Sequence, residues 1–308
     1  MPDYDQLLDA EMKAYLARCD ALYPPDAVTL DIAGQRRVYD AMCADFDVGR
    51  PDGVAVKDEP QGGVPCRHYT PADPAGTVIY YHGGGFVVGG LDSHDSICAE
   101  ICAKTGLRVV SVDYPLAPEH HYPEDFDAAW RAYVAISAAW PGPVVLAGDS
   151  AGGNLAAAIC HKARGAGPMP MGQVLIYPGL GGDWSWPSYI EHADAPQLTT
   201  RDMQFYQQIR FGGEPPANDP GCAPLRDSDF AGLVPTVCVS AQCDPLASDS
   251  EVYVQRIQQA GGQAMWIDEA GLVHGNLRAR TMSQRAANSF ERICGAISGL
   301  AQGRWPAV

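Results

Sequence analysis

Short apolar runs alternate with helical stretches along most of this 308-residue chain. Eight of the runs have the length and composition of β-strands, and Gly62-Gly63 between the first two indicates a hairpin. The strands are expected at residues 54–57, 64–69, 77–81, 108–112, 144–146, 173–177, 236–240 and 263–267. Helices between the later strands are expected at about 92–105, 124–140, 151–163 and 249–260. Because strands alternate with helices, the pattern predicts an α/β protein with a mostly parallel eight-stranded sheet.

Two segments do not follow this alternation. Before the first strand, apolar residues at helical spacing predict a helix over residues 4–18, ended by Pro24-Pro25, and a second helix at about 29–46. Between residues 179 and 226 only one helix is expected, at about 200–210, in a segment too long for a plain loop. The segment contains the aromatic residues Trp184, Trp186, Tyr189, Phe205, Tyr206 and Phe211. Such an insert after a strand is a candidate lid, although its aromatic residues could instead pack on one another.

The composition narrows the class of protein and of partner. With 37 acidic against 21 basic residues, the net charge of −16 argues against binding to nucleic acid or to an anionic membrane surface. The acidic N-terminus lacks the apolar core of a signal peptide, and no stretch approaches about 18 consecutive apolar residues, so no membrane span is expected. Ten cysteines without a C-x-x-C pair fit buried thiols in a reducing cytosol, which predicts a cytoplasmic protein. Cys98 and Cys102 share a helix face without nearby histidines and are expected in the core, so no metal site is predicted.

The stretch Gly148-Asp149-Ser150-Ala151-Gly152 lies between an apolar strand and an alanine-rich helix and matches G-x-S-x-G. A chain that turns from strand to helix within a few residues places the serine at a strained apex, with helix N–H groups beside it. Gly148 and Gly152 flank the apex because side chains there would collide with the strand and the helix. The motif also fits a tight turn with a capping serine, but its position favours Ser150 as a nucleophile. Asp149 is expected to be a structural carboxylate rather than a second base.

Three consecutive glycines follow His82 at the end of the third strand. Glycines free the backbone to turn its N–H groups toward a ligand, as an oxyanion hole requires. The expected donors are the N–H groups of Gly84 and Gly85, with that of Ala151 after the nucleophile, and Gly83 is a further candidate. Three glycines also occur in flexible turns, but a position at a strand end before the nucleophile strand favours the oxyanion loop. His82 is expected to hold this loop by a hydrogen bond rather than to act as the base.

The general base and its orienting carboxylate must come from other strand ends. His274 lies in a loop beyond the last strand, with glycines on both sides that suit a backbone shaped to present the ring. Asp244 ends another strand and is followed by proline, so it is the candidate carboxylate. Asp268 and Glu269 compete for that role but are expected to face solvent. Other histidines on polar or helical stretches are expected at the surface: His94, His120, His121, His161 and His192.

Together these stretches resemble the hormone-sensitive-lipase-like family of α/β-hydrolase carboxylesterases. The resemblance covers nearly the whole chain and rests on residues 82–86, 113–120 and 148–153, on Asp244-Pro-Leu and on His274-Gly, in the family's order. It implies an α/β-hydrolase fold with helices on both faces of the sheet and a helical cap. The implied cap consists of residues 1–50 and an insertion at 183–213, and the implied catalytic domain consists of residues 51–182 and 214–308. Cys243 and Asn276 stand where the family often has aromatic residues, which affects the size of the pocket.

The resemblance implies a serine carboxylesterase that needs no cofactor and cleaves short-acyl esters through an acyl-enzyme intermediate. Ser150, Asp244 and His274 are then the catalytic residues. The small-molecule ester is expected to contact Phe86, Asp149, Trp184, Tyr189, Phe205 and Tyr206. Two alternatives stay open: hydrolysis of an amide by the same residues, and a ligand-binding protein without catalysis, although all three catalytic residues are present. The last strand is expected at a sheet edge, where a second copy could pair with it in a homodimer.

Overall fold

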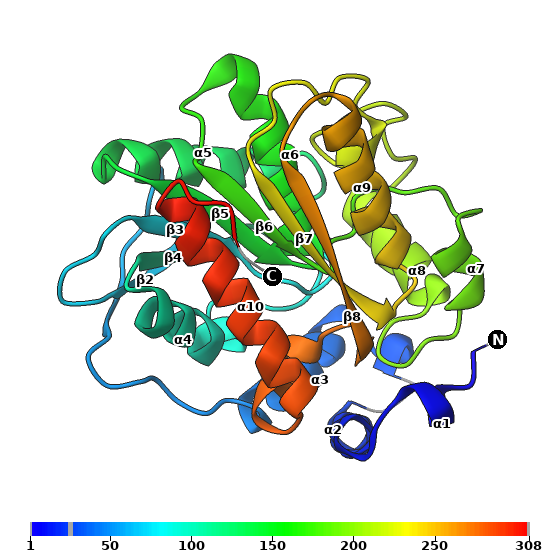
Figure 1. Ribbon diagram of the computed structural model, residues 1–308. Helices are drawn as coiled ribbons and strands as arrows, with labels where there is room; N and C mark the ends of the chain where they lie inside the picture. Colours follow the sequence, from blue (N-terminus) through cyan, green and yellow to red (C-terminus); the bar gives the residue numbers. More distant parts are fainter. Residues whose placement is uncertain (1, 24–26, 307–308) are drawn as a thin grey trace.

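An eight-stranded sheet forms the centre of the molecule (Figure 1). The computed structural model describes residues 2–23 and 27–306, and the strands run in the order β1-β2-β4-β3-β5-β6-β7-β8. The strands are β1 Ala55–Asp58, β2 Cys66–Thr70, β3 Thr77–Tyr81, β4 Arg108–Val112, β5 Val144–Asp149, β6 Gly172–Ile176, β7 Thr236–Cys243 and β8 Ala264–Val273. β2 is antiparallel to both β1 and β4, and all other pairs are parallel. The predicted hairpin and the mostly parallel eight-stranded sheet are therefore confirmed.

The strands differ from the prediction mainly at their C-terminal ends. β3 and β4 have the predicted bounds, whereas β7 and β8 continue together to Cys243 and Val273. Because parallel strands end on one side of a sheet, β5, β7 and β8 bring Ser150, Asp244 and His274 to the same edge. Among the described strands β8 pairs only with β7, so it lies at the sheet edge as predicted. Pairing of this edge with a second copy stays a prediction.

Ten α-helices lie within the described residues. They are α1 Tyr4–Leu7, α2 Ala10–Leu22, α3 Ile32–Asp45, α4 Asp95–Thr105, α5 Glu124–Ala139, α6 Ala151–Ala166, α7 Pro187–Glu191, α8 Thr200–Phe211, α9 Ala247–Gln259 and α10 Gln284–Ala301. The helix predicted over residues 4–18 is divided in two, because the Asp9 side chain accepts the Met12 N–H and caps a new helix, α2. Pro24-Pro25, predicted to end this helix, lies outside the described residues. α7 and α10 are not among the predicted helices.

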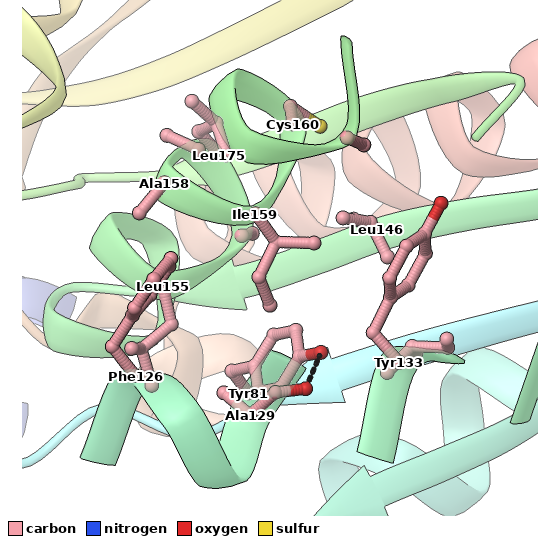
Figure 2. Packing of buried hydrophobic residues seen from close by; sticks show 14 of the residues in the cluster. Tyr81, Phe126, Ala129, Tyr133, Leu146, Leu155, Ala158, Ile159, Cys160 and Leu175 are labelled. Carbon is pink, nitrogen blue, oxygen red and sulfur yellow. Dashed lines mark hydrogen bonds between the residues drawn. The ribbon is translucent and has the colours of Figure 1, made fainter. Parts of the chain in front are cut away.

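Helices cover both faces of the sheet (Figure 1). α5, α6 and α9 pack on one face, and α4 and α10 pack on the other. Figure 2 shows the first face, where Leu146 of β5 and Leu175 of β6 lie in one apolar cluster with Phe126 of α5. Within this cluster the Tyr81 hydroxyl donates to the Ala129 carbonyl over 3.2 Å. Burial of each large apolar side chain contributes roughly 1.5–3 kcal/mol, so these layers hold the strand ends in place.

The N-terminal helices and the insert between β6 and β7 lie outside these layers. α2 and α3 pack on the C-terminal ends of β7 and β8, at the arrowheads in Figure 1. α7 and α8 of the insert pack on the segment just after β7. The Tyr4 hydroxyl lies 3.0 Å from His192 Nδ1, and the side chains of Tyr23 and Tyr206 are hydrogen-bonded. The two segments therefore touch each other over the edge of the sheet that carries Ser150.

The prediction for the histidines is partly wrong. His120 and His121 are exposed as predicted. Three others are buried: His94, His161 and His192. Each of these rings has a polar partner, as a buried imidazole requires; His161 Nδ1, for example, lies 2.6 Å from an Asp227 carboxylate oxygen.

The exposure of Asp268, Glu269 and the cysteines was also predicted. Glu269 is buried and forms an ion pair with Arg292 rather than facing solvent, whereas Asp268 is exposed as predicted. All ten cysteines are buried and free, as expected, and the cytoplasmic location stays a prediction. Within residues 2–23 and 27–306, no helix combines the length and the apolar character needed to cross a membrane.

Candidate active site

Ser150 forms the whole turn between β5 and α6, because no other residue separates the two elements. Its φ of +54° and ψ of −116° are strained for a residue with a side chain. A Cβ on Gly148 would lie 2.4 Å from the Gly152 backbone, and one on Gly152 would lie 1.8 Å from the Tyr81 carbonyl oxygen. Both positions therefore require glycine. The turn presents the Ser150 side chain at the C-terminal end of β5, on the side of the sheet where the parallel strands end.

Three side chains from different strand ends form one hydrogen-bonded row. Ser150 Oγ lies 2.9 Å from His274 Nε2, and His274 Nδ1 lies 2.7 Å from Asp244 Oδ2. The Asp244 side chain is fully buried, whereas 12% of the His274 side chain is exposed. The other Asp244 oxygen accepts the backbone N–H of Leu246 over 2.9 Å, which fixes the plane of the carboxylate. The row has the order of atoms that a serine nucleophile, a base and an orienting carboxylate require.

The loop that carries His274 is held on several sides. Gly275 has a φ of +74°, and its carbonyl accepts the Tyr15 hydroxyl of α2 over 3.0 Å. The Tyr177 ring packs against the His274 ring, with 4.7 Å between their centroids. The Asn276 side chain donates to the last carbonyl of β8 over 2.8 Å. These contacts leave the imidazole a single orientation, toward Ser150.

The glycine-rich loop after β3 borders the same cavity as the serine. Among the described residues, the backbone N–H groups of Gly84, Gly85 and Ala151 have no acceptor. Free N–H groups are what an oxyanion hole requires. The Gly83 N–H instead donates to Asp149 Oδ1 over 2.9 Å. The candidate Gly83 is therefore wrong as an oxyanion donor, because its N–H is already used to anchor the loop.

Asp149 is a buried carboxylate behind this loop. Besides the Gly83 N–H, it accepts the Tyr80 hydroxyl over 2.8 Å, and His94 Nε2 lies 3.2 Å from it. Burial by itself would raise the pKa of Asp149, but His94, Arg278 and the hydrogen bonds outweigh burial and lower that pKa. Asp149 is thus the structural carboxylate that was predicted. Its assignment to the substrate pocket is wrong, because it supports the loop from the side away from the cavity.

His82 also holds this loop at Gly83. The ring is fully buried and stacks on Tyr114, with 4.4 Å between the centroids. Its Nδ1 lies 2.9 Å from the Gly83 carbonyl oxygen. Burial lowers the pKa of His82 to about 4, so the ring is neutral at pH 7 and donates from Nδ1. The prediction that His82 positions the loop is confirmed by this hydrogen bond.

A cavity of about 170 Å³ lies beside Ser150. Of the residues predicted to contact substrate, four line it: Phe86, Trp184, Tyr189 and Tyr206. Phe205 does not, since successive residues of α8 point about 100° apart and its neighbour Tyr206 faces the cavity. Other lining residues were not predicted from the sequence, among them Asn154, Leu198, Met203, Gln207, Arg210, Arg226 and Leu246. Only the lining residues of α8 could have been recognised in the sequence, because residues 203, 206, 207 and 210 recur at helical spacing and therefore share one face of the helix.

The far wall of the cavity depends on Asp249. This fully buried carboxylate accepts the N–H groups of Leu180 and Gly182 over 2.6 and 3.3 Å and the Tyr189 hydroxyl over 2.7 Å. Burial raises the pKa of Asp249 to about 7, although these three donors oppose the effect. The protonation of one side chain therefore influences the segment that shapes the cavity.

We expect Asp249 to make the protein less stable as the pH rises from 5 to 8. Its pKa is about 7 in the folded protein against 3.8 in an ordinary aspartate, so between these values the folded state holds a proton that the unfolded chain has released. The free energy of unfolding therefore falls with pH across that window, by about 1–3 kcal/mol relative to Asp249→Asn. Urea unfolding at pH 5 and pH 8 measures it, with the exposed Asp127→Asn as a matched control. Equal pH dependence in wild type and Asp249→Asn would contradict this expectation.

Known proteins resemble this chain in both sequence and fold. The family model described as alpha/beta hydrolase fold matches residues 78–278, which include Ser150, Asp244 and His274. The carboxylic ester hydrolase LipN of Mycobacterium tuberculosis (strain ATCC 25618 / H37Rv) is 33% identical over 291 residues, covering 88% of this chain and 77% of that protein. The esterase LipI of the same strain is 38% identical over 232 residues, covering 71% of this chain and 72% of that protein. The solved structure of a hyperthermophilic esterase from the archaeon Pyrobaculum calidifontis has a TM-score of 0.86 and 27% identity, covering 96% of this chain and 99% of that one.

Proposed function

Since this chain belongs to the hormone-sensitive-lipase-like family of α/β-hydrolase carboxylesterases, we propose that it cleaves short-acyl esters at Ser150 through an acyl-enzyme intermediate. Carboxylic ester hydrolysis is the activity by which its relatives are named. The observation that carries the proposal is the row of Ser150, His274 and Asp244, with 2.9 and 2.7 Å between successive polar atoms. The row ends in the wall of a cavity large enough for a small ester.

His274 is the general base of the first step. Asp244 accepts the Nδ1–H of His274, so the lone pair of Nε2 faces Ser150 Oγ. As Oγ attacks the carbonyl carbon, its proton moves to Nε2, and the buried Asp244 carboxylate stabilises the resulting imidazolium. That proton then passes to the alcohol oxygen as the ester C–O bond breaks, and the acyl group remains on Ser150. In the second step His274 deprotonates water, which attacks the acyl carbon. The bond between that carbon and Oγ breaks, the proton on Nε2 returns to Oγ, and the acid is released.

The oxyanion that forms in each step is bound by backbone N–H groups. Gly84, Gly85 and Ala151 supply them, and none of the three needs to give up another partner among the described residues. Asp149 and His82 anchor the N–H and the carbonyl of Gly83, so the start of the glycine-rich loop is in place before the reaction begins. Each donor of this kind contributes roughly 2.7–4 kcal/mol to the stability of the transition state.

The N-terminal segment 1–50 and the insert 183–213 form a cap over the catalytic domain, which consists of residues 51–182 and 214–308. Support comes from the cavity, whose walls include Tyr189 of α7 and Tyr206 of α8. Further support comes from the contacts of Tyr4 with His192 and of Tyr23 with Tyr206, which join the two cap segments. Of the two cap segments, the insert supplies the residues that line the cavity.

Short acyl chains are expected to be the best substrates because the walls of the cavity are tied in place. Tyr189 donates a hydrogen bond to Asp249, and Arg210 donates one to Asp125. Each added methylene gains about 0.8 kcal/mol while there is room. A further carbon forces overpacking that costs roughly 1–3 kcal/mol, so kcat/KM should rise and then fall sharply. The measurement is kcat/KM on p-nitrophenyl esters from acetate to palmitate.

Two variants of α8 test whether the cavity sets this limit. Met203→Ala, which enlarges the cavity, should move the optimum to longer chains. Gln204→Ala, on the exposed side of the same helix, is the matched control and should leave the optimum where it is. A maximum at long chains in the wild type, or a jump in rate above the solubility limit of the substrate, would contradict a closed esterase cavity.

Neither alternative function is favoured. A ligand-binding protein without catalysis would not need the intact row of Ser150, His274 and Asp244. Hydrolysis of an amide uses the same residues, but the relatives described above are named for ester hydrolysis. The ester therefore remains the substrate class that the residues and the relatives support together.

A further inference from the structure

We propose that the natural substrate carries a carboxylate at the end remote from the scissile bond, and that the Arg226 guanidinium binds it. This inference rests on the proposed esterase function and specifies the class of ester that the cavity selects. Arg226 ends a 3₁₀ turn, Pro224–Arg226, and lines the same cavity as Ser150. Its guanidinium is a forked donor group that is always charged.

The charges on the cavity wall are opposite in sign to the charge of the protein. The chain has a net charge of −16. Yet among the described residues that line the cavity, Arg210 and Arg226 are the charged ones, and no aspartate or glutamate is present. An acidic protein repels anions at long range, but screening limits that field to about 8–10 Å. Inside the cavity the two guanidinium groups therefore make the largest contribution to the electrostatic potential at a bound substrate.

Arg210 is already neutralised by the protein itself. Its Nε lies 2.7 Å from Asp125 Oδ2, and the two side chains are 5% and 2% exposed. The guanidinium carbon also lies 3.4 Å from the centre of the Phe86 ring. These contacts tie α8 to α5 and to the oxyanion loop. The charge of Arg210 is thus balanced by Asp125 and holds α8 in position, and only its Nη2 has no hydrogen-bond partner among the described residues.

Arg226 has no such partner. Its Nη1 donates to the Ala217 carbonyl over 3.0 Å, and among the described residues its Nε and Nη2 have no acceptor. The side chain is exposed and forms no ion pair within this part of the chain. Hydrogen bonds from Ser185 and, more weakly, the Arg226 charge lower the pKa of the exposed Asp183. Asp183 uses Oδ1 to accept both groups of Ser185, so it does not occupy the guanidinium.

A carboxylate can accept the Arg226 N–H groups that have no acceptor among the described residues. It is planar, and its two oxygens can accept two parallel N–H groups of a guanidinium. The wall of the same cavity also includes Trp184 and Leu246, which suit a short alkyl chain. An ester with a few methylenes between the scissile carbonyl and a terminal carboxylate would contact both the apolar wall and the cation. Half-esters of dicarboxylic acids, and acyl esters of hydroxy acids, have this chemistry.

The experiment compares charged and neutral esters of equal chain length. On the acyl side, ethyl hydrogen glutarate and ethyl hydrogen adipate are compared with ethyl pentanoate and ethyl hexanoate. On the alcohol side, 4-acetoxybutyrate is compared with butyl acetate. Alkyl esters avoid the rapid self-cleavage of activated half-esters, and a pH-stat follows the acid released. For each pair the readout is the ratio of kcat/KM for the charged ester to that for the neutral ester.

Three variants assign the effect to Arg226. In Arg226→Gln the ratio should fall about tenfold or more in one of the two series, which also identifies the side of the ester that carries the carboxylate. Arg226→Lys keeps the charge but loses the fork, so it should retain part of the preference. Arg201→Gln changes the net charge equally on the exposed face of α8, outside the cavity, and should leave the ratio within about twofold of wild type. Salt at about 0.5 M should reduce the ratio in wild type and not in Arg226→Gln.

The outcomes separate this inference from the proposed function. If the wild type cleaves neither neutral nor charged esters, the proposed function is wrong. If it cleaves the neutral esters and Arg226→Gln has the wild-type ratio in both series, only the inference about Arg226 is overturned. Circular dichroism of each variant shows that it is folded, and the ratio itself cancels any loss of active protein.

Discussion

His274→Ala is expected to lower kcat as much as Ser150→Ala does, by a factor on the order of 10⁶, and the double variant should be no worse. The reason is that the three side chains act as one unit. Without the imidazole there is no proton acceptor 2.9 Å from Ser150 Oγ, and without the serine the imidazole has no hydroxyl to deprotonate. Asp244→Asn should cost less, about 10⁴, because it changes the tautomer of His274 while leaving the base in place. Kinetics on a short p-nitrophenyl ester measure all four variants.

His120→Ala is the matched control for this series, because His120 is exposed and forms its ion pair with Glu124 outside the cavity. It should have the kcat of wild type. Circular dichroism and urea unfolding of each variant separate a slow enzyme from a fraction of unfolded protein. If His274→Ala kept most of the wild-type kcat, another residue would be the base. If the losses of Ser150→Ala and His274→Ala multiplied in the double variant, the two residues would act independently.

Gly84→Ala is expected to lower kcat by about 10²–10³ with a much smaller change in KM. Gly84 has a φ of +130°, and a Cβ there would lie 2.0 Å from the Val88 carbonyl oxygen. The loop must therefore move, and its free N–H groups move with it by enough to lose the oxyanion. Gly85→Ala should have a similar effect by a different route, because its Cβ would lie 2.6 Å from the Tyr206 ring. Steady-state kinetics with a short-acyl ester give the two constants.

Gly63→Ala separates the loss of the oxyanion hole from the general strain of alanine at positive φ. Gly63 has a φ of +78° in the β1–β2 hairpin, and a Cβ there would meet no atom within 4 Å. This variant should lose about 1 kcal/mol of stability or less and keep its kcat. Urea unfolding of all three glycine variants shows whether lost activity follows lost stability. Normal turnover in a folded Gly84→Ala would mean that the loop is only a turn.

The strand–turn–helix around Ser150 could be predicted because its causes are local. Gly148 and Gly152 are required by backbone atoms that lie within a few residues or on the adjacent strand. The apolar runs that became β3 and β4 were long enough to define both ends. The order of Ser150, Asp244 and His274 along the chain, each after a strand, then indicated that all three reach one edge of a parallel sheet. Predictions of this kind need only periodicity, glycine and the direction of the strands.

The partners of buried polar groups could not be predicted in the same way. His94 supports Asp149 across 55 positions of sequence, and Arg210 pairs with Asp125 across 85. Nothing in the residues around His94 distinguishes it from an exposed histidine at the start of a helix. Its burial follows from where α4 packs on the sheet. The Gly83 N–H is unavailable as an oxyanion donor because it donates to Asp149 of the neighbouring strand β5.

The amino-acid sequence by itself determined the sheet, the strained serine turn, the three catalytic candidates and the glycine-rich loop. Only the tertiary structure decided which N–H groups of that loop are free among the described residues and which aromatic residues of the insert face the cavity. It also decided that Arg226 lies in the cavity wall without an ion pair to any described residue. The physical reason is the range of the interactions. Backbone conformation and apolar periodicity depend on neighbours in sequence, whereas hydrogen-bond partners and cavity walls depend on how distant helices pack across the sheet.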